Sequence, residues 1–137
     1  MLLALFLLCS MVASYSDITR HRIPNLLLLS TALFLLTYYL FRGTLSPHLI
    51  FAVKVALSMA LFQWVSAGVM GMGDAKYLVV LALLSSNPGI FFHGLTFSIL
   101  LSCFGAIIYI CVFRTVETSI PLALPISVGF LISQFLA

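Results

Sequence analysis

The sequence predicts an all-α protein, a polytopic bundle of about six helices in a lipid bilayer. Two observations predict this fold class: the composition of the chain and its division into apolar segments. Of its 137 residues, 64% are hydrophobic and only 7% are charged, and the mean hydropathy is +1.28. Because soluble domains average about 25% charged residues, this chain has too few to cover a surface that faces water. Its length allows one domain, which we expect to span residues 1–137.

The individual helices are predicted from apolar segments bounded by polar residues. The segments are approximately Met1–Ser16, Leu26–Phe41, Leu49–Ala67, Tyr77–Ser86, Ile90–Phe113 and Ser119–Ala137. Several are shorter than the roughly 20 residues of a full span, so we expect flanking residues to lengthen some helices. The fourth is the weakest and is closed by a turn sequence, Ser85-Ser86-Asn87-Pro88-Gly89. A five-span bundle that merges or loses this segment is the structural alternative.

The first segment resembles a signal peptide only loosely. Val12-Ala13-Ser14 could form a cleavage site, but no basic region precedes the apolar run. We therefore expect this segment to be retained as a span.

The loops between the segments predict the orientation in the membrane. They are Asp17–Asn25, Arg42–His48, Gly68–Lys76, Asn87–Gly89 and Arg114–Thr118. The odd-numbered loops carry four basic residues, whereas the second loop and the start of the third span carry two, Arg42 and Lys54. Positive loops face the cytoplasm, so we expect the odd loops there and both termini outside.

Several classes of function are disfavoured. The net charge is only +3, and no run of Lys and Arg predicts nucleic-acid binding. Cys9, Cys103 and Cys111 lie in apolar stretches without a Cys-x-x-Cys pair, and the three His residues lack metal-ligand spacing. We therefore expect no metal and no cofactor. The oligomeric state does not follow from the sequence.

The chain has three acidic residues, Asp17, Asp74 and Glu117, and the six-span arrangement puts all three on one side of the membrane. Ionisable groups at membrane level are costly and are usually paired or functional. Asp17 and Asp74 could be ordinary loop acids that pair with Arg20 and Lys76. They could instead converge on one site. Glu117 has Arg114 as a partner three residues away.

Two neighbouring carboxylates could cut a peptide bond with one water molecule. They share a proton because both cannot easily ionise together. The ionised member acts as general base on water, and the protonated member polarises the peptide carbonyl and protonates the leaving amine.

The local sequence around each Asp favours a site. Asp74 follows Gly68-Val-Met-Gly-Met-Gly, in which Gly71 and Gly73 leave the backbone uncovered beside the carboxylate. Asp17 begins Asp-Ile-Thr-Arg-His-Arg-Ile-Pro-Asn25. This motif after a first span, and Gly71-Met-Gly-Asp-Ala-Lys76 before a fourth, resemble the type IV prepilin peptidases, intramembrane aspartyl proteases with a Gly-x-Gly-Asp motif.

The resemblance implies that Asp17 and Asp74 are the catalytic pair, with Gly71, Gly73 and Lys76 in the active-site loop. It implies an active site at the cytoplasmic face of the inner membrane. The substrate would be a pilin-like precursor whose short basic leader is removed just before its apolar helix.

Two features bear on the type of member. Larger members carry paired Cys-x-x-Cys motifs between the first two spans and also N-methylate the product, but here that loop is only Asp17–Asn25. We expect peptidase activity alone, as in the short Flp/Tad-type enzymes, with archaeal preflagellin peptidases as the second choice.

The start of the last segment allows two interpretations. Ala123-Leu124-Pro125 is similar to a Pro-Ala-Leu-Pro element near the active site of presenilin-like proteases. It is also an ordinary Pro-containing first turn of a helix, which is the interpretation that we favour.

A non-enzymatic membrane subunit, such as an ion or proton pathway or a secretion component, is the alternative function. Intramembrane Asp and Lys would then serve transport.

Overall fold

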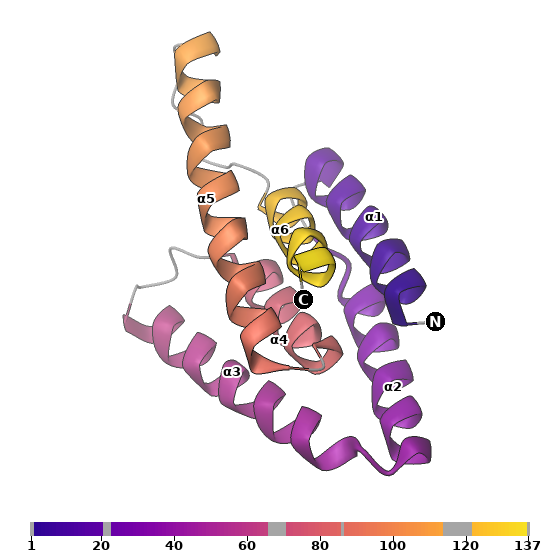
Figure 1. Cartoon of the computed structure of the whole chain (residues 1–137). Helices are drawn as coiled ribbons and strands as arrows, with labels where there is room; N and C mark the ends of the chain where they lie inside the picture. The colour runs from indigo at the N-terminus through magenta and orange to yellow at the C-terminus, as the bar shows by residue number, and fades with distance from the viewer. Residues whose placement is uncertain (1, 21–22, 66–70, 86, 114–121, 137) are drawn as a thin grey trace.

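The computed structural model describes residues 2–20, 23–65, 71–85, 87–113 and 122–136, and within them it contains six α-helices (Figure 1). They are α1 (Leu2–Arg20), α2 (Asn25–Arg42), α3 (Leu45–Val65), α4 (Met72–Leu84), α5 (Pro88–Phe113) and α6 (Ala123–Leu136). The predicted all-α fold class is confirmed.

A tight turn separates α4 from α5. The N–H of Ser85 donates to the Leu81 carbonyl at 2.9 Å and ends α4, while Asn87 Oδ1 accepts the N–H of Gly89 at 2.9 Å. Pro88 then occupies the first position of α5, where its missing N–H costs no helical hydrogen bond. The fourth apolar segment is therefore a helix of its own and is not merged with the fifth.

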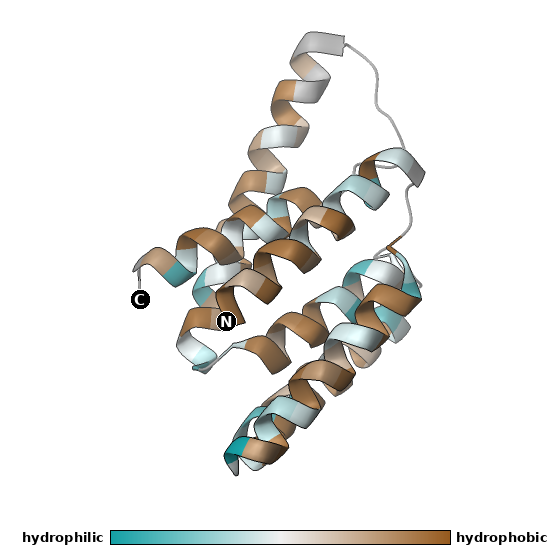
Figure 2. Cartoon of the chain, turned by 90° about the vertical axis from the view of Figure 1, so that its right-hand side faces the viewer, coloured by the Kyte–Doolittle hydropathy of each residue, from teal (hydrophilic) through white to brown (hydrophobic). Residues whose placement is uncertain are grey.

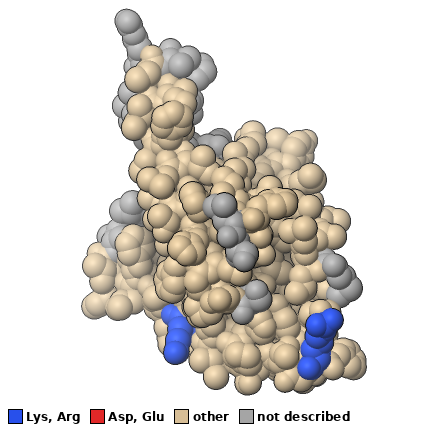
Figure 3. All heavy atoms as spheres, viewed as in Figure 1, with Lys and Arg blue, Asp and Glu red and all other residues tan. Residues whose placement is uncertain are grey.

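Four helices, α1, α2, α3 and α5, are long and apolar enough to cross a membrane, and α6 is a shorter apolar helix. Their outward surfaces carry large apolar side chains, such as Leu26, Phe41 and Trp64, that are more than three-quarters exposed. Figure 2 shows long hydrophobic stretches along the helices, and the face in Figure 3 is almost free of charge among the described residues. The chain is a membrane protein.

The short helix α4 lies in the interior of the bundle. It has only 13 residues, and it packs against α2, α3 and α5. Tyr77 and Ala82 have no exposed surface, and Ala75, Leu78, Val80, Leu81 and Leu83 are also buried. Because neighbouring helices and not lipid surround α4, it does not need the length of a full span.

The tightest described packing joins α5 and α6. A Cβ atom built on Gly129 of α6 would overlap Ser98 of α5, and one built on Gly94 of α5 would lie 2.9 Å from the Phe130 ring of α6. Small residues at such crossings let helices in lipid approach closely. This contact fixes α6 against the bundle and so determines where its first turn lies.

The helix boundaries correct several predicted loops. Asp17 lies in the last turns of α1, and Asp74 and Lys76 lie in the first turns of α4. Similarly, α3 begins at Leu45, so His48 is helical. The prediction ended the apolar segments before the charged and turn residues that follow them, but such residues continue a helix when its end has left the hydrocarbon or packs against protein.

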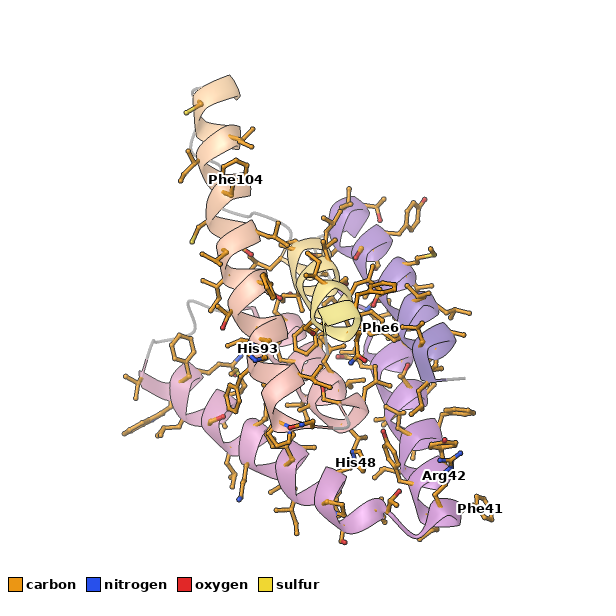
Figure 4. The ribbon with its side chains drawn as sticks, in the orientation of Figure 1. Phe6, Phe41, Arg42, His48, His93 and Phe104 are labelled. Carbon is orange, nitrogen blue, oxygen red and sulfur yellow. The ribbon has the colours of Figure 1, made fainter. Side chains whose placement is uncertain are left out.

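The helix ends gather into two groups. At one end of the bundle, His48 Nδ1 lies 3.2 Å from the Ser85 carbonyl and stacks on the Tyr39 ring at 3.9 Å. Figure 4 shows Arg42 and His48 at this end, where α2 meets α3. The end of α1 and the starts of α2, α4 and α6 meet at the opposite end, where both Asp residues lie.

Candidate active site

A cavity of about 330 Å³ lies where α1, α2 and α4 meet. Its polar lining includes the two carboxylates predicted from sequence, Asp17 from α1 and Asp74 from α4. The remaining lining residues are Ile23, Asn25, Gly71, Met72, Gly73 and Lys76. Fifty-six residues separate the two acids in sequence, so only the packing of α1 and α4 brings them to one space.

Asp17 is held by the first turn of α6. Its side chain is 8% exposed, and its Oδ2 atom accepts a hydrogen bond of 2.9 Å from the backbone N–H of Ala123. Ala123 is the first residue of α6, because the first helical hydrogen bond runs from Ile126 N–H to the Leu122 carbonyl. A first-turn N–H has no acceptor within its own helix, and Asp17 supplies one.

Asp74 lies in the first turn of α4, which begins after Gly71. The Ala75 N–H donates to the Gly71 carbonyl at 3.2 Å, so Gly71 caps the helix and Asp74 is its third residue. Acidic residues are favoured in a first turn, where the free N–H groups leave a partial positive charge. The side chain of Asp74 is partly buried and adjoins the cavity.

The environment of Asp74 raises its pKa from 3.8 to about 6. The larger cause is burial, which disfavours the charged form, and the smaller cause is repulsion from Asp17. Both side chains line the same cavity, which brings Asp17 close enough to Asp74 for this repulsion. The pair can therefore hold one proton close to neutral pH.

Lys76 connects α4 to the start of α2. Its Nζ donates a hydrogen bond of 3.1 Å to Asn25 Oδ1. Lys76 is exposed, so this contact contributes little stability, but it keeps a positive charge at the cavity mouth. The sequence also allowed Asp17 to be an ordinary loop acid that pairs with Arg20. This alternative is not tested, because the Arg20 side chain lies outside the described residues.

The two glycines of the predicted loop play different steric roles. A Cβ atom at Gly71 would lie 3.1 Å from Asp74 Oδ2, which is closer than such contacts normally are. A Cβ atom at Gly73 would lie 3.6 Å or more from Ile23, an ordinary contact distance. Gly71 therefore leaves room for the carboxylate itself, whereas Gly73 lies against the segment that enters α2.

All five residues predicted for the site, Asp17, Gly71, Gly73, Asp74 and Lys76, line the one cavity. The sequence reasoning missed Met72 and the backbone N–H of Ala123. It assigned Asn25 only to the start of α2. One feature of the sequence could have pointed to Ala123, namely the similarity of Ala123-Leu124-Pro125 to a protease element. The interpretation that we favoured was instead an ordinary first turn of a helix. Pro125 lies in the first turn of α6, which confirms the favoured interpretation. The similarity to the protease element stays a prediction.

Some predicted features lie outside the described residues. These include Arg114 and Glu117, which were expected to pair with one another. Within the described part of the chain, no three His, Cys, Asp or Glu residues form a group that could hold a metal ion.

Comparison with known proteins gives one match. A family model described as the type IV leader peptidase family matches residues 4–111, a stretch that contains both Asp residues and ends before α6. No curated protein matches the chain, and no solved structure does.

Proposed function

Because the chain belongs to the type IV leader peptidase family of aspartic prepilin peptidases, we propose that Asp17 and Asp74 are its catalytic pair. We further propose that it removes the short basic leader from type IV pilin-like precursors. The observation that carries the proposal is the shared cavity, in which the pKa of Asp74 is raised to about 6 in part by Asp17.

In the proposed mechanism, Asp74 carries the proton and Asp17 is ionised. Asp17 takes a proton from a water molecule, and the water oxygen forms a bond to the carbonyl carbon of the scissile peptide. Asp74 donates a hydrogen bond to the carbonyl oxygen and then gives its proton to the leaving nitrogen as the C–N bond breaks. The pair ends singly protonated, as it began, with the proton now on Asp17.

The position of the cavity supports a substrate that lies partly in lipid. The cavity lies at the end of the bundle where α1 leaves its apolar span, and α2 and α4 begin. A precursor whose apolar helix lies in the bilayer would present the bond just before that helix at this level. Among the described residues, Lys76 is at this end, while Arg42 lies at the opposite end.

We propose that the cavity faces the cytoplasm. The support is the sequence, in which the loops expected on the cytoplasmic side carry four of the six basic residues, together with Lys76, which lines the cavity itself. A basic leader that has not crossed the membrane would reach the carboxylates from this side.

Co-expression with pilin-like precursors from the same source tests the activity, with loss of the leader followed by a gel shift. Asp17→Asn and Asp74→Asn should each reduce cleavage by about 10²–10⁴-fold, the usual contribution of one acid–base group. Glu117→Gln is the matched control, since it neutralises the third acidic residue. Membrane insertion is checked for each variant, and full cleavage by an inserted Asp17→Asn or Asp74→Asn protein would overturn the assignment.

A further inference from the structure

A cluster of buried hydroxyl groups lies one helical turn deeper in the bundle than the candidate active site. It consists of Ser10 and Ser14 of α1, Tyr77 of α4 and Ser127 of α6. Tyr77 has no exposed surface, and Ser10 and Ser127 are 6% and 8% exposed. Polar groups at this depth need partners, because lipid and apolar side chains offer none.

The hydroxyl groups bond to one another across three helices. The Tyr77 hydroxyl donates to Ser10 Oγ at 3.1 Å and lies 2.9 Å from Ser127 Oγ. Ser14 Oγ lies 3.3 Å from Ser127 Oγ. One phenol therefore connects α4 to α1 and α6 at the same time.

Each of these helices also supplies a group to the active site one turn away. Ser14 precedes Asp17 by three residues on α1, and Tyr77 follows Asp74 by three residues on α4. On α6, the Ala123 carbonyl accepts a hydrogen bond of 2.7 Å from Ser127 Oγ, while the N–H of the same residue donates to Asp17. These contacts form a continuous path that begins at Asp17, passes through Ala123, Ser127 and Tyr77, and ends at the turn that carries Asp74.

We propose that this hydroxyl cluster is a positioning device, in which Tyr77 and Ser127 fix the separation and orientation of Asp17 and Asp74. The inference rests on the proposed function of the two Asp residues. Two carboxylates that share one proton and one water molecule need to be held within a fraction of an ångström, and small displacements are costly to rate. The two carboxylates and the Ala123 N–H that bonds to Asp17 lie on three helices, and the hydroxyl contacts join these helices, so the hydroxyl groups set their relative depth.

The position of α4 makes the device necessary. This helix has only 13 residues, so lipid does not set its depth as it does for a full span. At its far end, α4 is fixed by Tyr39, whose hydroxyl donates to the Leu84 carbonyl at 3.4 Å. At the active-site end, the described hydrogen bonds that tie α4 to α1 and α6 come from Tyr77.

The chain offers matched controls for both residues. Tyr39→Phe is the counterpart of Tyr77→Phe. It removes a buried tyrosine hydroxyl of α2 that bonds to the end of α4 far from the site. Ser133→Ala removes a buried serine hydroxyl of α6 that donates only to the Phe130 carbonyl of its own helix, as the counterpart of Ser127→Ala.

The experiment measures cleavage of a pilin-like precursor by each purified variant in detergent, with kcat and KM separated and thermal unfolding recorded. Tyr77→Phe and Ser127→Ala should each lower kcat by roughly 10- to 100-fold with little change in KM, because the substrate still binds beside misplaced carboxylates. They should also displace the pH limits of kcat/KM, since the interaction between the two Asp residues changes. Tyr39→Phe and Ser133→Ala should keep the wild-type kcat and pH limits.

Two results would overturn the proposal. One is wild-type kcat and pH limits in folded Tyr77→Phe and Ser127→Ala. The other is a loss of kcat in all four variants that simply follows their loss of thermal stability, which is what a purely structural role predicts. If Tyr77→Phe does not fold, Ser127→Ala decides alone, because it removes a single oxygen from the same cluster. Failure of the proposed function is recognised separately, by normal cleavage in Asp17→Asn or Asp74→Asn.

Discussion

The carboxylate of Asp17 accepts a hydrogen bond of 2.9 Å from the backbone N–H of Ala123, 106 residues further along the chain. This contact joins the end of the first helix to the start of the last one. It gives Asp17 two separable tasks, which are to satisfy a buried N–H group and to take part in the proposed cleavage.

The two tasks of Asp17 should separate in two substitutions. Asp17→Asn keeps an oxygen that can accept the Ala123 N–H, so we expect near-normal stability together with the large loss of cleavage given above. Asp17→Ala leaves that buried N–H without a partner, which should lower the free energy of unfolding by about 1–3 kcal/mol. Thermal unfolding in detergent, measured beside the cleavage assay, checks both. Equal stability of the two variants would mean that the hydrogen bond contributes nothing.

The rate of cleavage should depend on pH through the pair. The proposed active form holds one proton, and the pKa of Asp74 is raised to about 6. As the pH rises through this value Asp74 loses its proton, so kcat/KM should fall above about pH 6. Because the proposed mechanism needs one proton shared by the pair, we expect a bell-shaped profile that belongs to the pair and not to either Asp alone. A flat profile between about pH 5 and 9 would contradict proton sharing.

The glycines before Asp74 should differ in their tolerance of a methyl group. Gly71→Ala brings a Cβ to 3.1 Å from Asp74 Oδ2, so the carboxylate has to move and kcat should fall by roughly tenfold. Gly73→Ala makes only an ordinary contact with Ile23 and should retain most activity. Kinetics of the two purified variants test this, and a larger defect in Gly73→Ala would show that the steric reasoning is wrong.

Adding side-chain volume where α5 crosses α6 should lower the stability of the protein. Gly129→Ala would overlap Ser98, so the helices have to separate, and we expect a loss of about 1–3 kcal/mol in unfolding free energy. Gly105 of α5 is exposed with no heavy atom near its Cβ position, which makes Gly105→Ala the control. Denaturation of both variants in the same detergent measures the difference. Similar stabilities would indicate that the crossing relaxes without cost.

The separation of α4 from α5 could be predicted from sequence because turn chemistry is local. Ser85 ends one helix and the Asn87-Pro88-Gly89 sequence starts the next, through hydrogen bonds between near neighbours. Helix ends were predicted less well. Asp17 and Asp74 are polar, and the prediction placed them in loops, but burial against protein keeps both within helices.

The sequence by itself determined that this is a helical membrane protein, and the resemblance of two of its motifs to a known family identified Asp17, Gly71, Gly73, Asp74 and Lys76 as one set. Composition suffices for the first conclusion, because it depends only on which residues are present, whereas the second depends on the resemblance. Only the tertiary structure decided that the Ala123 N–H meets Asp17 and that Tyr77 joins α4 to α1 and α6. A backbone N–H has no sequence signature, and the meeting of helix ends far apart in the chain depends on how side chains pack between them.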